Sequence, residues 1–170
     1  MERSGTRSLV LGAAVLGGLL AGADVDRALV ANAAWRDLGP LAWADFSRHA
    51  DLSIRGLALY PILGIGAALF ALAAAISLLR AGRRQRGALL PVCLAALLSI
   101  SGLLVTAQAA PIMLGVAHLG QDQASLARAM DGFEWWGNVR AVLQGLAFVA
   151  SLWALSALGE AARTPRPPGP

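Results

Sequence analysis

Apolar residues dominate four long stretches of this chain, and most polar and charged residues lie in the connections between them. A helix that crosses a bilayer needs about 20 mostly apolar residues, and each stretch reaches that length. Small residues recur in these stretches at helical spacing, which lets helix backbones approach closely where lipid provides no hydrophobic drive. The pattern predicts an all-α polytopic membrane protein with one four-transmembrane-helix bundle over residues 1–160. The predicted helices cover residues 8–30, 56–79, 88–110 and 133–158.

The two ends of the chain carry further signals. A basic start, an apolar run and the small residues of the sequence AGA before Asp24 are also typical of a cleaved secretory signal. Ala14, Gly18 and Gly22 recur at four-residue intervals, which favours instead a retained helix that packs against another. We expect the retained helix, with cleavage as the alternative. The Pro-rich residues 161–170 are predicted to be disordered.

Composition and charge agree with a membrane location. The 170 residues are 57% hydrophobic and 14% charged, with a mean hydropathy of +0.62, which is outside the range of ordinary soluble domains. The net charge is +4, but the arginines flank apolar stretches and form no basic face that would bind nucleic acid. Four arginines in the connection between the second and third helices predict a cytoplasmic loop, and hence two cytoplasmic termini at the plasma membrane. These are Arg80, Arg83, Arg84 and Arg86.

The opposite, exterior side of the predicted bundle is acidic and aromatic. In the first exterior connection, Pro40 can start a short helix that places Trp43, Phe46 and Ile54 near one face. We expect this segment to lie in the membrane interface as a lid over the bundle. Four tryptophans gather at the same level, as interfacial aromatic residues do. They are Trp35, Trp43, Trp135 and Trp136.

Both histidines of the chain lie in the exterior connections, His49 in the first and His118 in the second. Imidazole titrates near neutral pH, so either histidine is a candidate general base, with a plain surface position as the alternative. The spacing of the histidines and the neighbouring carboxylates matches no metal-ligand pattern, so we expect no metal.

An arginine lies inside the fourth predicted helix and raises the main question about function. Trp136, Arg140 and Gln144 recur at four-residue intervals, so they share one face of the helix. Burying a guanidinium in lipid costs about 2.5 to 3.5 kcal/mol at the bilayer centre, so this face is expected to point inward. Asp24 or Asp26, at a similar predicted depth in the first helix, is the expected partner of Arg140.

Three interpretations of Arg140 follow from that position. The arginine pairs with an aspartate to fix the helix register, it binds a substrate or an oxyanion, or it reaches up to water without a specific role. Arg27 competes for the same carboxylates. The third helix carries two neighbouring polar stripes, one of Ser101 and Gln108 and the other of Ser99, Gly102 and Thr106. These polar groups are expected to face the protein, and the amide of Gln108 needs a hydrogen-bond partner there.

Several of these features together resemble a known family. The chain has four helices, a proline (Pro111) just after the polar third helix, and the set Trp136, Asn138 and Arg140 in the sequence FEWWGNVRAVL. In these respects it resembles the small integral-membrane anthrone oxygenase-like family over most of residues 8–158. The family often has a polar residue after the proline, where this chain has Ile112. The resemblance implies oxidation of an anthrone to an anthraquinone by molecular oxygen without a metal or flavin cofactor.

The resemblance also implies a site at the exterior end of the bundle. An anthrone carries an acidic carbon activated by its carbonyl, so the reaction needs an apolar cavity, a base and a cation for the oxyanion. The expected catalytic residues are Arg140 as the cation and one of Asp24, Asp26 and His49 as the base. The expected substrate-binding residues are Trp135, Trp136, Asn138, Gln144, Gln108 and His118.

Two other classes of function fit the same sequence. A tight bundle with an interfacial lid is also typical of a non-enzymatic accessory or lipid-binding subunit of a bacterial envelope. A transporter fits less well, because four helices leave little room for alternating access without oligomerisation. The expected partners are the lipid bilayer and a small aromatic or lipid-like ligand, and a homo-oligomer stays open.

Overall fold

The computed structural model describes residues 2–81 and 86–163, and every regular element in these ranges is a helix. Together the helices form the predicted all-α four-helix bundle. Four helical stretches are long and apolar enough to cross a membrane, namely Ser4–Leu38, Ile54–Ala81, Gly87–Val116 and Gln123–Glu160. The elements in chain order are α1 (Glu2–Asp26), η1 (Arg27–Ala31), α2 (Asn32–Leu38), α3 (Pro40–His49), α4 (Ile54–Ala81), α5 (Arg86–Val116) and α6 (Gln123–Arg163).

Every transmembrane helix is longer than the apolar pattern alone predicts. The first one continues through the π-helical turn η1 and through α2 to Leu38, and α5 continues past Pro111 to Val116. The short helix α3 begins at Pro40, as expected. Arg83, Arg84 and residues 164–170 lie outside the described residues, whereas residues 161–163 belong to α6.

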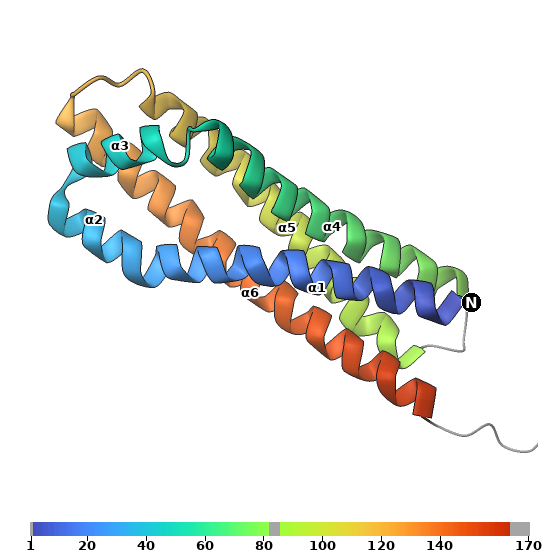
Figure 1. Ribbon diagram of the computed structural model, residues 1–170. Coiled ribbons are helices and arrows are strands. Elements are labelled where there is room, and N and C mark those ends of the chain that lie inside the picture. The colour runs from blue at the N-terminus through green and yellow to red at the C-terminus, as the bar shows by residue number, and fades with distance from the viewer. Residues whose placement is uncertain (1, 82–85, 164–170) are drawn as a thin grey trace, which may run out of the picture.

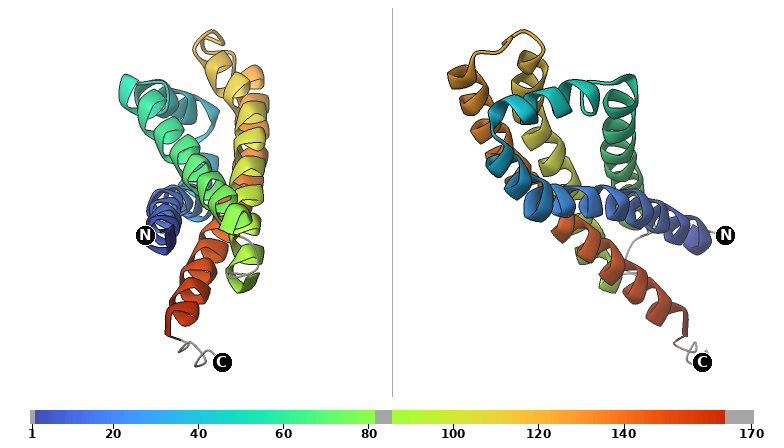
Figure 2. Two further views of the ribbon diagram at one scale, coloured as in Figure 1. Left: turned by 90° about the vertical axis from the view of Figure 1, so that its right-hand side faces the viewer. Right: turned by 60° about the vertical axis from the view of Figure 1, so that its left-hand side comes forward.

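The long helices run side by side along the bundle, and the two short helices α2 and α3 lie together at one end (Figures 1 and 2). We call this end the α3 end. At the other end, here the terminal end, α1 begins and α6 finishes. Figure 2 shows α4 diverging from α5 toward the α3 end, with α3 crossing between them.

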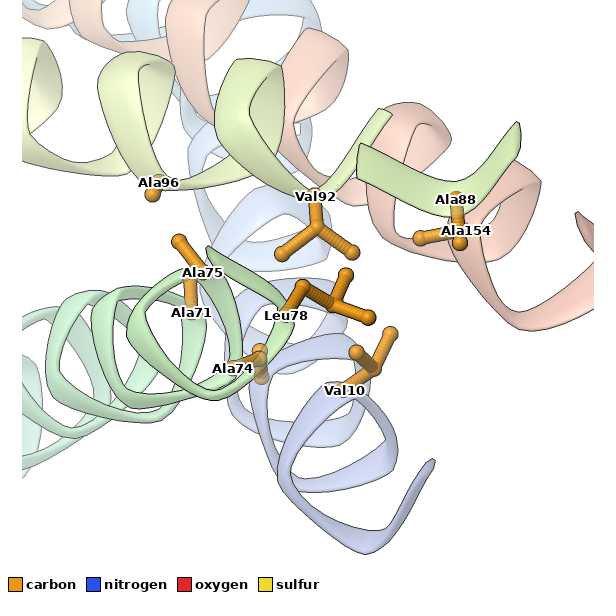
Figure 3. Packing of buried hydrophobic residues seen from close by; sticks show 10 residues of the cluster. Val10, Ala71, Ala74, Ala75, Leu78, Ala88, Val92, Ala96 and Ala154 are labelled. Atoms are coloured by element: carbon orange, nitrogen blue, oxygen red, sulfur yellow. The ribbon is translucent and has the colours of Figure 1, made fainter. Parts of the chain in front are cut away.

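Alanines form the core at the terminal end. Ala74 of α4 and Ala154 of α6 are both fully buried, and Val92 of α5 packs between the helices (Figure 3). Because methyl side chains let the backbones approach closely, this half of the bundle is held by van der Waals contact. The cluster consists of Val10, Ala13, Ala71, Ala74, Ala75, Leu78, Ala88, Val92, Ala96 and Ala154.

Larger side chains form the core at the α3 end. Gly39 has a φ of 90°, a left-handed conformation that lets the chain turn sharply before Pro40 opens α3. Trp43 of α3 is 1% exposed and packs in a cluster with Phe133 of α6. Arg48 fixes the other end of α3 by donating hydrogen bonds to the carbonyl oxygens of Val116 (3.2 Å) and Gly120 (2.6 Å).

Helix lengths place the α3 end relative to a bilayer. About 20 helical residues cross the roughly 30 Å hydrocarbon core. On three helices, a count of 20 residues from a charged residue at the terminal end toward the α3 end reaches another polar residue. We call the level of these three polar residues the second polar level. Helices α2 and α3 lie beyond this level. The counted pairs are Arg7 and Arg27, Arg80 and Tyr60, and Glu160 and Arg140.

Candidate functional site

Arg140 forms an ion pair with Asp24 at the second polar level. Its Nε donates to Oδ1 of Asp24 at 3.1 Å and to Oδ2 at 3.3 Å, and its Nη2 donates to Oδ1 at 2.8 Å. The Arg140 side chain is 12% exposed and that of Asp24 is 3% exposed. This planar, two-point contact is the strongest geometry that a guanidinium and a carboxylate can adopt. The predicted pair is therefore present, with Asp24 as the partner.

Helical geometry explains the choice between the two aspartates. Asp26 follows Asp24 by two residues, about 200° around an α-helix, so only one of them can face α6. Asp24 is buried and Asp26 is exposed. Further toward the α3 end, two more polar contacts join the same helices. Asn32 donates to Asn138 (3.4 Å), and Arg36 contacts Glu134 (2.8 Å).

Arg27 forms a second buried ion pair, which the sequence does not predict. It does not compete with Arg140 for Asp24 as expected, because its Nη2 donates to Oδ1 of Asp51, in the turn between α3 and α4. The guanidinium carbon also lies 5.4 to 5.7 Å from the ring centroids of Trp35, Tyr60 and Phe133. Three aromatic faces and one carboxylate therefore replace the water that this cation loses.

Local sequence determines where Asp51 lies. The turn folds back so closely over α4 that a Cβ atom at Gly56 would overlap the carbonyl oxygens of Ala50 and Asp51. The Ser53 hydroxyl accepts a hydrogen bond from the Gly56 amide at 3.1 Å and donates one to the Ala50 carbonyl at 2.7 Å. Ser53 thus caps α4, and Gly56 leaves room for the turn that brings Asp51 to Arg27.

A cavity of about 210 Å³ lies between the four long helices, below α3. Its wall is mostly apolar, and both buried arginines contribute to it. Most binding pockets for drug-sized molecules measure about 300 to 1,000 Å³, so this cavity encloses a small molecule or part of a larger one. The lining residues are Leu20, Arg27, Asp51, Gly56, Leu57, Tyr60, Pro61, Gly64, Ile65, Leu103, Thr106, Ala109, Ala110, Met113, Phe133, Arg140 and Gln144.

One edge of the cavity lies at the surface of the bundle. Leu57, Pro61 and Ile65 follow one another at four-residue intervals on α4, and all three line the cavity while being exposed on the bundle surface. Ala110 lies on the α5 side and is partly exposed. Leu57, Pro61 and Ile65 on α4 and Ala110 on α5 therefore lie on the open side of the cavity.

Two residues that line the cavity each carry a buried oxygen with no hydrogen-bond partner among the described residues. These oxygens are Oδ2 of Asp51, whose other oxygen binds Arg27, and Oε1 of Gln144. Asp51 is 7% exposed and Gln144 is 1% exposed. Leaving a buried acceptor unpaired costs about 1 to 3 kcal/mol, so each oxygen lowers the stability of this part of the bundle.

The structure brings some of the predicted site residues together and separates others. Arg140, Asp24 and Gln144 lie within one buried region, and Trp136 packs beside it against the core of the α3 end. Asn138 is exposed and contacts Asn32. Asp26, Trp135, His49 and His118 are exposed and do not line the cavity.

His49 and Gln108 lie outside the cavity for two different reasons. The His49 ring nitrogen Nδ1 lies 2.8 Å from the carbonyl oxygen of Asp45, on the outer face of α3. Gln108 was expected to face the protein, and this was wrong because it is exposed. Gln108 lies about 200° from Thr106 around α5, on the same side of the helix as the exposed Leu104. It is also close to the second polar level, where lipid headgroups can form hydrogen bonds with its amide.

Among the described residues, no group of three or more His, Cys, Asp or Glu side chains is arranged to hold a metal ion. Comparisons of the chain with family models, curated proteins and solved structures found no match. The site therefore has to be interpreted from its own geometry. Sequence reasoning missed Asp51 as a cavity residue, although Gly56, five residues later, signals a close backbone approach.

Proposed function

We propose that this protein is a plasma-membrane protein that binds a lipophilic aromatic molecule in the cavity between α4 and α5 and oxidises it with molecular oxygen. One observation carries the proposal: an apolar cavity leads from the lipid face to buried charges. The oxidation itself is suggested by the resemblance to anthrone oxygenases. Both termini are taken to be cytoplasmic, which puts the cavity in the outer half of the membrane.

The chemistry needs a base and a cation next to an apolar surface. Asp51 lines the cavity, and its Oδ2 has no hydrogen-bond partner among the described residues, so Asp51 is our candidate for removing a proton from the acidic carbon of an anthrone. Arg140 also lines the cavity and suits the stabilisation of the enolate oxygen. Asp51 replaces the earlier candidates for the base, because Asp24 is bound by Arg140, and Asp26 and His49 are exposed.

The proposed reaction balances without another reductant. After proton removal, the enolate carbon adds dioxygen and takes up a proton to give a hydroperoxide. Loss of water from this hydroperoxide, with the second hydrogen of the same carbon, leaves a carbonyl. In total, a CH2 group and O2 become a C=O group and H2O.

Conversion of a simple anthrone to its anthraquinone tests this proposal. Membranes that contain wild-type protein are compared under oxygen with empty membranes and with membranes that contain Asp51→Asn, at matched expression. We expect conversion above the background in the wild type and its loss in Asp51→Asn, because an amide cannot act as the base. Equal conversion by wild-type and empty membranes would count against an oxygenase.

A matched pair of alanine substitutions tests whether the cavity is the site. Ala110→Phe places a ring in the opening, whereas Ala107→Phe adds the same ring to an exposed position of α5 outside the cavity. We expect Ala110→Phe to lose most of the conversion and Ala107→Phe to keep it. Equal activity in the two variants would move the reaction away from this cavity.

A binding protein without catalysis is the second candidate. The observation that favours it is the two-point contact of Arg140 with Asp24, which already satisfies much of the guanidinium. In that case Arg140 fixes the helices, and the cavity binds a lipid-like molecule unchanged. A bound, unaltered aromatic probe with no oxygen uptake would support this candidate.

A further inference from the structure

Gly64 lies at the inner end of the cavity, which is the end nearer the alanines of the terminal half. It shares this end with Leu20 of α1 and Leu103 of α5, and all three residues line the cavity. One turn further toward the terminal end, α1 and α4 come into contact, because a Cβ atom added at Gly17 would lie 3.8 Å from that of Ala67. Along the buried face of α4, Gly64 is therefore where the open space gives way to close packing.

The missing side chain of Gly64 leaves this end of the cavity open. A Cβ atom added there would meet only two side-chain ends, Cδ2 of Leu103 at 3.4 Å and Cδ2 of Leu20 at 3.5 Å. One methyl group therefore fits at residue 64, and a larger side chain would extend between the two leucines and take up cavity volume. Gly66 differs, because its added Cβ would come within 2.8 Å of Leu16 and that glycine serves close packing.

The volume of the cavity indicates how much of an aromatic molecule it can hold. A protein cavity of about 150 Å³ lined by Leu, Ile and Phe binds one molecule of benzene. The present cavity, at about 210 Å³, has about 1.4 times that volume, which suits two fused rings. Tyr60 and Phe133 line it nearer the α3 end, so a flat ring system also gains contact with aromatic side chains.

We infer that Gly64 determines how large a ring system the cavity accepts. Two fused aromatic rings enter, and the leading ring lies between Leu20 and Leu103, beside the bare backbone of Gly64. Any further ring of the same molecule stays on the open side of the cavity, near Pro61 and Ala110. The inference rests on the proposed binding of a lipophilic aromatic molecule but is independent of its oxidation.

Benzene and naphthalene are the probes that test this inference, because they differ by one fused ring and carry no polar group. Their affinities are measured for the full chain in lipid nanodiscs under nitrogen, by thermal stabilisation, with empty nanodiscs as the partition control. After correction for partitioning, we expect the wild type to bind naphthalene more tightly than benzene, because the second ring adds van der Waals contact.

Gly64→Val fills the place of the second ring. We expect it to weaken naphthalene binding roughly tenfold and to leave benzene binding nearly unchanged. Gly22→Val is the matched control, because Gly22 is exposed on α1 and a Cβ atom there meets nothing within 4 Å, so both affinities should stay as in the wild type. Gly64→Ala replaces Gly64→Val if the larger side chain prevents accumulation, and we expect from it a smaller loss in the same direction.

A second substitution distinguishes lost space from a weakened fold. Leu103→Ala, combined with Gly64→Val, returns volume to the inner end of the cavity. Naphthalene binding should therefore recover in the double variant. If Gly64→Val acted by destabilising the bundle, the second large-to-small substitution would weaken binding further, because it removes buried contacts.

The same measurements show when the inference is wrong. An unchanged ratio of the two affinities in Gly64→Val would overturn it, and so would a double variant that binds naphthalene no better than Gly64→Val. A wild type that binds neither probe would contradict the proposed binding in this cavity as well. Because nitrogen excludes turnover, the expected binding pattern without any anthrone conversion would support this inference and contradict only the proposed oxidation.

Discussion

The two halves of this bundle are built on opposite principles. At the terminal end, alanines from four helices form a closed core in which the backbones approach closely. At the α3 end, the same helices diverge around aromatic rings, two buried ion pairs and a cavity of about 210 Å³. The terminal half has close contacts between its helix backbones, whereas the α3 half has fewer such contacts and contains buried charges and a cavity instead.

The difference between the two halves shows that the α3 half contains the features that lower the stability of this fold. Unpaired acceptors and empty volume both cost free energy, and the two unpartnered oxygens of the cavity lie in the α3 half. Functional sites commonly break the rules that the rest of a fold obeys. The α3 half is therefore the region in which we propose that binding takes place, and the terminal half would serve as its scaffold.

Breaking the ion pair between Arg140 and Asp24 is expected to have the largest effect on the stability of the bundle. Arg140→Met leaves the carboxylate of Asp24 buried without its partner, which we expect to cost about 3 to 5 kcal/mol of unfolding free energy. The double variant Asp24→Leu with Arg140→Met removes both charges and is expected to recover most of that loss. Unfolding in mixed micelles with increasing SDS, followed by circular dichroism, measures both.

The control for that experiment is a more exposed ion pair, which joins α2 to α6. Arg36 contacts Glu134, and the two side chains are 57% and 17% exposed. Because water and salt reach Arg36 and screen this pair, Arg36→Met should cost less than about 1 kcal/mol of unfolding free energy, well below the loss in Arg140→Met. If the two single variants lose equal stability, burial of the Arg140 pair is not what makes it important.

Overpacking the terminal half is expected to have the next largest effect. Ala74 is fully buried among the four helices, so Ala74→Leu forces backbones apart and is expected to cost about 1 to 3 kcal/mol. Ala58→Leu, at an exposed position of the same helix, is the matched control and should change little. The same SDS titration measures both variants. A core that accepts Leu at residue 74 without loss would contradict the close packing described for this half.

Sequence reasoning recovered the parts of this structure that depend on position along one helix. The four-helix bundle, the start of α3 at Pro40 and the inward face of Arg140 and Gln144 all follow from helical spacing. The pairing of Arg140 with an aspartate follows from equal depth. Depth alone could not choose between Asp24 and Asp26, because the choice depends on how α1 is rotated against α6.

The missed features depend on contacts between distant segments. Asp51 lies in a turn, where helical periodicity says nothing about direction, and it reaches Arg27 only because Gly56 admits the turn. Gln108 was assigned to the protein interior by its polarity, although its angular position on α5 points to lipid. The cavity itself arises from the divergence of α4 and α5, which no single stretch of sequence encodes.

Removing an unpartnered buried amide is expected to raise stability slightly. Gln144 and Ser151 are both buried on α6, at 1% and 4% exposure, but the Ser151 hydroxyl donates to the Ala147 carbonyl at 2.9 Å. Gln144→Leu should therefore increase the unfolding free energy by about 1 kcal/mol in the empty protein. Ser151→Ala, the control with a satisfied partner, should change it little. A loss of stability in Gln144→Leu would mean that the amide supports the fold and is not held for a ligand.

The smallest expected effect lies outside the membrane, at the start of α6. Asp122 caps this helix, its Oδ1 accepting a hydrogen bond from the Ala124 amide at 3.2 Å, and a hydrogen bond from Ser125 holds the pKa of Asp122 below its usual range. A lowered pKa means that the cap stabilises the helix above about pH 4 and is lost as the pH falls further through the folded pKa. Hydrogen exchange of the first turn of α6 should therefore show increased opening in acid, after correction for the intrinsic exchange rate. Asp122→Asn keeps a capping oxygen without titrating, so its opening should not depend on pH. A wild type that behaves like Asp122→Asn would show that the capping carboxylate contributes nothing to this helix end.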